Sequence, residues 1–112
     1  MKTELETYWS EDHFVLETYR QVQKDLLGLF DAEISKEHLL SNPYPVLHEF
    51  ILRVISKLAE NSDDRLAQFI YKVDLKESRF LSFISVGDTD GLAHEILHRE
   101  AQKVYLRRKF SS

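Results

Sequence analysis

The most apolar stretch of the chain reads VLHEFILRVISKLAE and occupies residues 46–60. Seven of its large apolar residues recur three and four positions apart; they are Val46, Leu47, Phe50, Ile51, Val54, Ile55 and Leu58. In an α-helix this spacing gathers the side chains on one broad face. The pattern therefore predicts a helix at the centre of the core.

The segments before this stretch show the same helical period. Apolar residues between Glu11 and Phe30 predict a first helix over residues 11–30, with Ser10 as its N-cap. Thr3 and Glu6 also match a capping box, so this region forms either one long helix or two. A short helical turn is expected over residues 35–40. The prolines of residues 42–45 should end that turn by Ser41 and suit the start of the central helix.

Three further helical segments follow the central stretch. Ser62 is a plausible cap for a helix over residues 62–73. Asp74 with Glu77 resembles a second cap, which predicts a kink or a new helix near Val73. The apolar pattern then continues through residues 80–84 and stops at Gly87. A loop over residues 87–91, suited to a turn and an N-cap, precedes a last helix over residues 92–109.

Together these segments predict an all-α fold. We expect a single compact bundle or orthogonal array of about five helices with short loops, formed by residues 1–112 as one domain. The chain has no cysteine, which excludes disulfides and cysteine-based metal sites. It has no apolar run long enough for a transmembrane helix and no apolar segment near its start. We therefore expect a cytoplasmic protein without membrane contact.

The charge is unevenly distributed along the chain. The net charge is −4, so we do not expect the whole molecule to bind nucleic acid. Positive charge gathers in the last predicted helix, in residues Arg99, Lys103, Arg107, Arg108 and Lys109. Cations at a helix C-terminus stabilise that helix by interacting with its dipole. The alternative is that these five residues bind an anion, such as phosphate, or an acidic partner.

The sequence His94-Glu95-Ile96-Leu97-His98 matches the pattern H-E-x-x-H. On a helix this spacing places His94 and His98 one turn apart on one face, where they could hold Zn²⁺, with Glu95 as a general base. A catalytic zinc usually has three protein ligands. Since no His, Asp or Glu follows Glu100, the third ligand would have to come from upstream.

The candidates for that third ligand include His13, His38 and His48. A second interpretation of the motif needs no metal. The helical pattern makes Ala93, Ile96, Leu97, Ala101 and Val104 the buried side of the last helix. His94, His98 and Tyr105 then lie at the border of that side, where such rings pack and leave a polar tip in water.

Three aromatic residues lie near predicted helix ends beside polar residues: Tyr8, Trp9 and Tyr44. Exposed Trp and Tyr side chains are favoured anchors at protein interfaces, so these three are candidate interface residues. The alternative is that they close the ends of the bundle. The other aromatic residues, Tyr71 among them, are mostly expected in the core.

These observations favour a non-enzymatic protein–protein interaction module or a homo-oligomer, without a cofactor. Its partner would be a second copy of the chain or an unidentified protein. The alternative is a metal-dependent hydrolase or a metal-binding protein centred on residues 94–98, with zinc as its cofactor.

Overall fold

The computed structural model describes residues 7–61 and 63–110. Within these residues it contains a short 3₁₀ helix, six α-helices and no strand. In chain order the elements are η1 (Tyr8–Ser10), α2 (Asp12–Leu26), α3 (Lys36–Ser41), α4 (Pro43–Asn61), α5 (Asp63–Val73), α6 (Glu77–Ser85) and α7 (Thr89–Phe110). The predicted all-α fold is confirmed.

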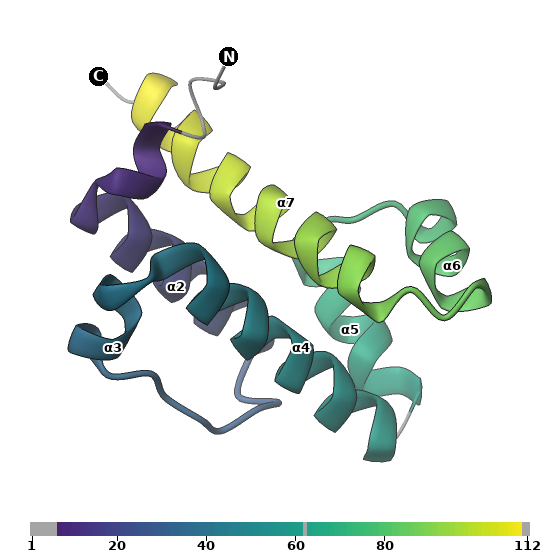
Figure 1. Ribbon diagram of the computed structural model, residues 1–112. Coiled ribbons are helices and arrows are strands. Elements are labelled where there is room, and N and C mark those ends of the chain that lie inside the picture. Colours follow the sequence, from purple (N-terminus) through teal and green to yellow (C-terminus); the bar gives the residue numbers. More distant parts are fainter. Residues whose placement is uncertain (1–6, 62, 111–112) are drawn as a thin grey trace.

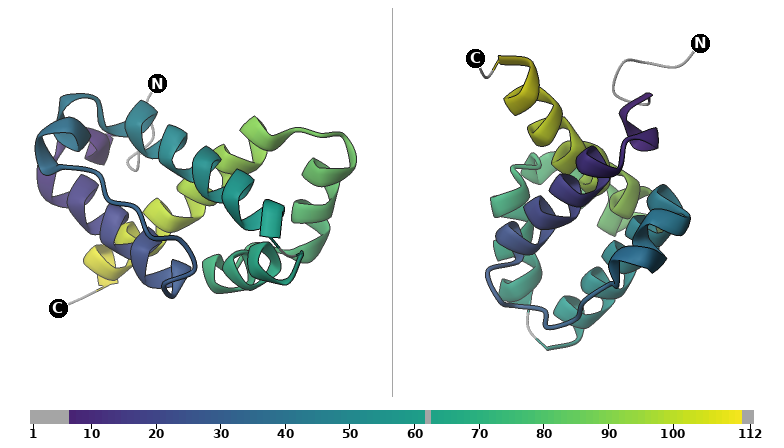
Figure 2. Two further views of the ribbon diagram at one scale, coloured as in Figure 1. Left: turned by 90° about the horizontal axis from the view of Figure 1, so that it is seen from below. Right: turned by 90° about the vertical axis from the view of Figure 1, so that its left-hand side faces the viewer.

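Helix α7 is the longest element and organises the others (Figure 1). It contacts α2, α4, α5 and α6, and its closest partner is α4, which runs beside it. Figure 2 shows η1, α2 and α3 towards one end of the molecule and α5 and α6 towards the other. Helices α4 and α7 run between the two ends, so residues on these two helices meet near the middle of the fold.

The central apolar stretch packs as predicted. Six of the seven residues of its apolar face are buried and Val46 is partly exposed; Leu52, which lies outside that face, is also partly exposed. Burying a side chain of this size contributes about 1.5–3 kcal/mol to folding. The buried side predicted for α7 is also confirmed, because Ala93, Ile96, Leu97, Ala101 and Val104 are all inaccessible to solvent.

The first helix differs from its prediction at both ends. Ser10 is not the N-cap, because it belongs to η1, and Glu11 precedes the first helical residue of α2. The described part of this region therefore forms two elements; the capping box of Thr3 and Glu6 lies outside the described residues. Helix α2 ends at Leu26 instead of Phe30, because Leu27 and Gly28 both adopt left-handed backbone angles, with φ of 52° and 76°.

The connection from α2 to α3 is longer than the short loops that were expected. It is fixed by one buried hydrogen bond, in which the backbone N–H of Ile34 donates to the hydroxyl oxygen of Tyr19 at 2.8 Å. Ser35 then caps α3, since its hydroxyl oxygen accepts from the N–H of His38 at 3.2 Å.

The remaining boundaries follow the predicted breaks with small shifts. Helix α3 ends at Ser41, and α4 starts at Pro43, so both prolines lie in its first turn, where a missing N–H costs no intrahelical bond. Asp74 adopts a φ of 69°, so α5 ends and a new helix, α6, follows; Lys76 holds its N-cap position, so the prediction of a cap at Asp74 is wrong. Ser62, the predicted cap of α5, lies outside the described residues.

Helix α7 begins at Thr89, earlier than predicted, because Asp88 closes its first turn. Oδ1 of Asp88 accepts from the N–H of Gly91 at 2.9 Å, which is the geometry of a helix N-cap. Among the described helices none is both long and apolar enough to cross a membrane.

Candidate functional site

The packing of α4 on α7 brings together three side chains with metal-ligating atoms. His48 comes from α4, and Asp90 and His94 come from the first turns of α7. Nε2 of His48 lies 3.1 Å from Oδ1 of Asp90, and Nε2 of His94 lies 3.6 Å from Oδ2 of the same carboxylate. One ligand atom from each residue can be chosen so that all three lie within 4.8 Å of one another. We call these three residues the His48–Asp90–His94 cluster.

The two imidazole rings of the cluster are stacked on each other. Their centroids are 3.9 Å apart and their planes differ by 22°. The hydroxyl of Tyr44 lies 2.5 Å from Nδ1 of His94 and so fixes the orientation of that ring. Burial, and the negative charge of Asp90, raise the pKa of Tyr44, so its phenol is neutral at physiological pH.

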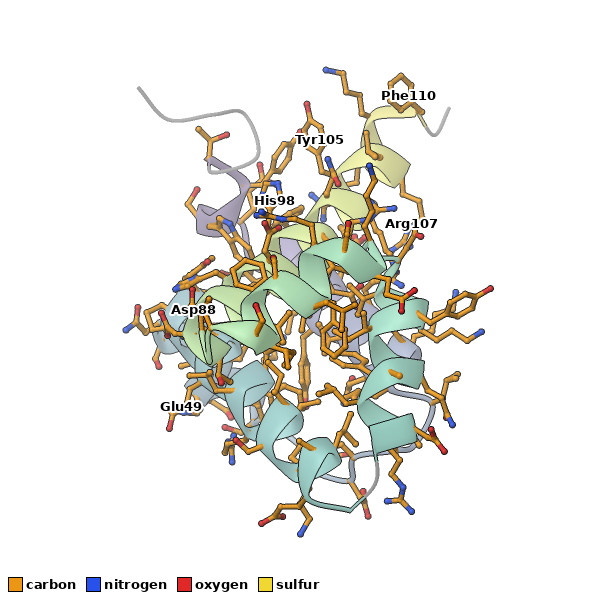
Figure 3. The ribbon with its side chains drawn as sticks, turned by 90° about the vertical axis from the view of Figure 1, so that its right-hand side faces the viewer. Glu49, Asp88, His98, Tyr105, Arg107 and Phe110 are labelled. Carbon is orange, nitrogen blue, oxygen red and sulfur yellow. The ribbon has the colours of Figure 1, made fainter. Side chains whose placement is uncertain are left out.

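The structure separates the residues of the H-E-x-x-H pattern. His94 belongs to the cluster, but His98 does not. Figure 3 shows His98 further along α7, between Asp88 and Tyr105. The carboxylate of Glu95 is paired with the guanidinium of Arg79 on α6. Of the three upstream histidines considered as a third ligand, His48 is the one that lies beside His94; His13 and His38 are exposed residues of α2 and α3.

The predicted interface aromatics lie at the end of the molecule where η1 meets α7. Tyr8 packs on Phe14 and Tyr105, and Trp9 packs edge-to-face on Phe14 and on Tyr44. All three predicted residues are half-buried. They therefore contribute to the closure of this end of the fold, and their use at an interface stays a prediction.

The cations predicted as an anion site all contact groups of their own chain. Arg99 pairs with Asp74, Lys103 with Asp25, and Arg108 with Glu11 and Glu17. Arg107 donates to the side-chain oxygen of Gln21 at 2.7 Å, and Nζ of Lys109 lies 3.3 Å from the hydroxyl oxygen of Tyr105. An anion would have to compete with these intramolecular partners.

A buried charged cluster between α2 and α7 was not predicted. Glu100 is inaccessible to solvent, and Asp25 is 7% exposed. Nζ of Lys103 lies 2.7 Å from Oδ2 of Asp25 and 3.2 Å from Oε1 of Glu100. The sequence contained a signal for it, because the helical pattern of α7 places Glu100 on the same side as Ile96, Leu97 and Val104.

The two carboxyl groups of this buried cluster have opposite pKa shifts. Burial, followed by the neighbouring carboxylate of Asp25, raises the pKa of Glu100 to about 9. Burial also tends to raise the pKa of Asp25, but hydrogen bonds with Glu100, Lys103 and Gln21 outweigh it and lower that pKa. At neutral pH Glu100 is therefore protonated and Asp25 is ionised.

Helix α6 leaves apolar side chains exposed. It contains no buried residue, and Leu81 and Ile84 are 51% and 46% exposed. Beside it, Tyr71 of α5 is 79% exposed, so the prediction that Tyr71 lies in the core is wrong. A groove of about 360 Å³ lies between the two helices, and we call it the α5–α6 groove. Its lining residues are Ala67, Ile70, Tyr71, Leu75, Glu77, Phe80 and Leu81.

Comparison of the chain with models of protein families, with curated protein sequences and with solved structures gives no significant match.

Proposed function

We propose that the protein is a non-enzymatic interaction module that self-associates through the α5–α6 groove. The observation that supports this proposal is the exposure of Leu81 and Ile84 on a helix without any buried residue. Large apolar side chains gathered on one exposed face of a small protein are typical of interaction surfaces. Small-molecule sites combine an apolar lining with several convergent polar groups. The lining of this groove contains one charged residue, Glu77, so it resembles a protein-binding surface more than a small-molecule site.

The groove suits a second copy of the chain as its partner. Leu81 lines the groove, and Ile84 follows it about one helical turn later on α6, so one face carries both the apolar lining and exposed apolar side chains. A two-fold contact uses the same patch on both subunits, so the apolar side chains of one copy can pack on those of the other. The charged residues near the groove have both signs, with Lys72 and Lys76 beside Glu77 and Asp64. A face of mixed charge does not repel its own copy.

Concentration-dependent sedimentation of the wild-type chain and of Leu81→Asp tests the proposal. A two-fold contact buries the substituted residue twice, so we expect the dimer dissociation constant to rise by at least about tenfold, or about 1.4 kcal/mol. The matched control is Phe110→Asp, because Phe110 is also an exposed apolar residue but lies at the other end of α7 (Figure 3).

Two results would contradict this proposal. One is a wild-type chain that stays monomeric at every concentration. The other is a dimer that dissociates in Trp9→Ala but not in Leu81→Asp, which would assign the interface to the aromatic residues around η1. Far-UV circular dichroism of each variant shows whether the helices are retained.

A further inference from the structure

We propose that His48, Asp90 and His94 form a binding site for one divalent transition-metal ion, with zinc as the principal candidate. The donor set contains two imidazoles and one carboxylate. Zinc sites use these ligand types, and sites with three protein ligands leave a further position for water or another ligand. The site differs from the H-E-x-x-H pattern, because it uses one histidine of that pattern and takes its other ligands from a different helix and from the preceding turn of α7.

The distances are close to those a metal site requires. Tetrahedral zinc with bonds of about 2.0–2.1 Å places its ligand atoms roughly 3.3 Å apart. The two histidine nitrogens lie 3.1 and 3.6 Å from the carboxylate oxygens of Asp90. The carboxylate therefore already lies beside both rings at nearly the required spacing, with one oxygen near each Nε2.

One rearrangement accompanies binding. Stacked rings direct their nitrogen lone pairs side by side, so His48 and His94 must swing apart to direct both lone pairs at one ion. The side chains of His94 and Asp90 are 46% and 69% exposed, so these two have room to move, whereas His48 is 15% exposed and is held more firmly. Metal binding therefore replaces ring stacking by coordination.

Tyr44 occupies the position of an outer-shell partner. Its oxygen lies at Nδ1 of His94, the ring nitrogen that is not directed at Asp90. Metal-ligating histidines generally donate a hydrogen bond from their other nitrogen, and this partner fixes the tautomer and the ring orientation. With a metal at Nε2, the Nδ1–H of His94 donates to the Tyr44 oxygen. Tyr44 thus acts as a positioning residue.

Titration of the metal-free chain with Zn²⁺ in a calorimeter tests the site. We expect one ion per chain, and a loss of affinity of about 100-fold or more in His48→Ala and in His94→Ala, since removing a ligand should exceed the 10–100-fold effect of an outer-shell change. Asp90→Asn should also weaken binding, because it removes the negative charge with little change of shape. Tyr44→Phe should weaken it about 10–100-fold.

His98→Ala is the matched control, because it removes the other histidine of the same helical pattern. The proposal expects unchanged affinity in His98→Ala. It is overturned if His98→Ala weakens binding as much as His48→Ala does, or if the wild-type chain binds no Zn²⁺. Visible absorption of the Co²⁺-loaded chain gives a second readout, because tetrahedral and octahedral ions absorb differently.

The same titration of Leu81→Asp separates this proposal from self-association. A site built within one chain keeps its stoichiometry and affinity in the monomeric variant. A site that disappears in Leu81→Asp would belong to the interface between two copies, and the intrachain site would be wrong.

Discussion

The ammonium group of Lys103 lies 2.7 Å from the carboxylate of Asp25, and this ion pair joins the last helix to the first α-helix inside the fold. Lys103 also donates to the backbone oxygen of Lys72 on α5 at 2.8 Å. One side chain of α7 therefore connects three helices. Because Glu100 lies in the same cluster, the stability of the fold depends on the protonation of these groups.

Glu100 should make the protein less stable at alkaline pH. Its pKa is about 9 in the folded chain, against 4.5 for an ordinary glutamate, so between these values the folded state retains a proton that the unfolded chain releases. The free energy of unfolding contributed by this group is therefore greatest below pH 4.5 and falls as pH rises towards 9. Glu100→Gln, which cannot ionise, should remove this fall.

Urea unfolding of the wild type and of Glu100→Gln at pH 5, 7 and 9 measures the effect. We expect similar stability at pH 5 and a gain of more than about 1 kcal/mol for the variant at pH 9, since one pKa unit corresponds to about 1.4 kcal/mol. Parallel pH profiles of the two proteins would show that Glu100 does not titrate as inferred.

Lys103→Met should strongly destabilise the fold. The substitution preserves most of the side-chain length but leaves the carboxylate of Asp25 buried without its cation. Removing one partner of a buried pair costs about 3–5 kcal/mol, and the 17% exposure of Lys103 should reduce the loss to about 2–4 kcal/mol. The control Lys24→Met changes an exposed lysine of α2 and should alter the free energy of unfolding by less than about 0.5 kcal/mol.

Tyr19→Phe should loosen the connection between α2 and α3. The variant leaves the buried N–H of Ile34 without its acceptor, which costs about 1–3 kcal/mol. Hydrogen exchange measured by NMR should show faster exchange of the Ile34 amide than in the wild type. The control Tyr71→Phe changes an exposed tyrosine. It should alter neither the free energy of unfolding nor the exchange rate of the Ile34 amide.

Gly91→Ala should destabilise α7 although alanine favours helices. A Cβ at Gly91 would lie 2.3 Å from Oδ2 of Asp88 and 2.8 Å from Cε1 of Phe83, so it would displace the side chain that caps the helix. The lost cap and the displaced ring should outweigh the propensity gain of about 1 kcal/mol. Thermal unfolding should therefore occur at a lower temperature.

A double-mutant cycle locates the cause of this loss. If the Cβ acts through Asp88, Gly91→Ala should cost less in an Asp88→Ala background than in the wild type. Equal costs in the two backgrounds would assign the effect to Phe83 or to the backbone.

The sequence pattern was sufficient for features that depend on one helix. The apolar residues of α4 and the buried side of α7 follow the helical period, and the prolines in the first turn of α4 mark its start. The end of α2 could not be predicted in this way. Leu27 occupies a left-handed conformation that is normally unfavourable for leucine; the one local signal of this helix end is Gly28, and the apolar pattern that continues through Leu29 and Phe30 concealed it.

The sites depend on contacts between helices, which the sequence pattern does not contain. The H-E-x-x-H motif identified His94 and left His48 as one of three possible partners. Choosing His48 and adding Asp90 required the packing of α4 against α7. Glu100 could be recognised as a charged residue on a buried face, but its partner Asp25 lies on another helix and was not identifiable.

The absence of buried side chains in α6 has a consequence for the motions of the protein. A segment that buries little apolar area can detach locally at a lower free energy than the global unfolding of the chain. Helix α6 contacts mainly α7 and α5, and its Arg79–Glu95 pair lies near the surface. Its backbone amides should therefore exchange with deuterium earlier than those of α4, and a protomer docked on the groove would slow that exchange by holding α6 in place.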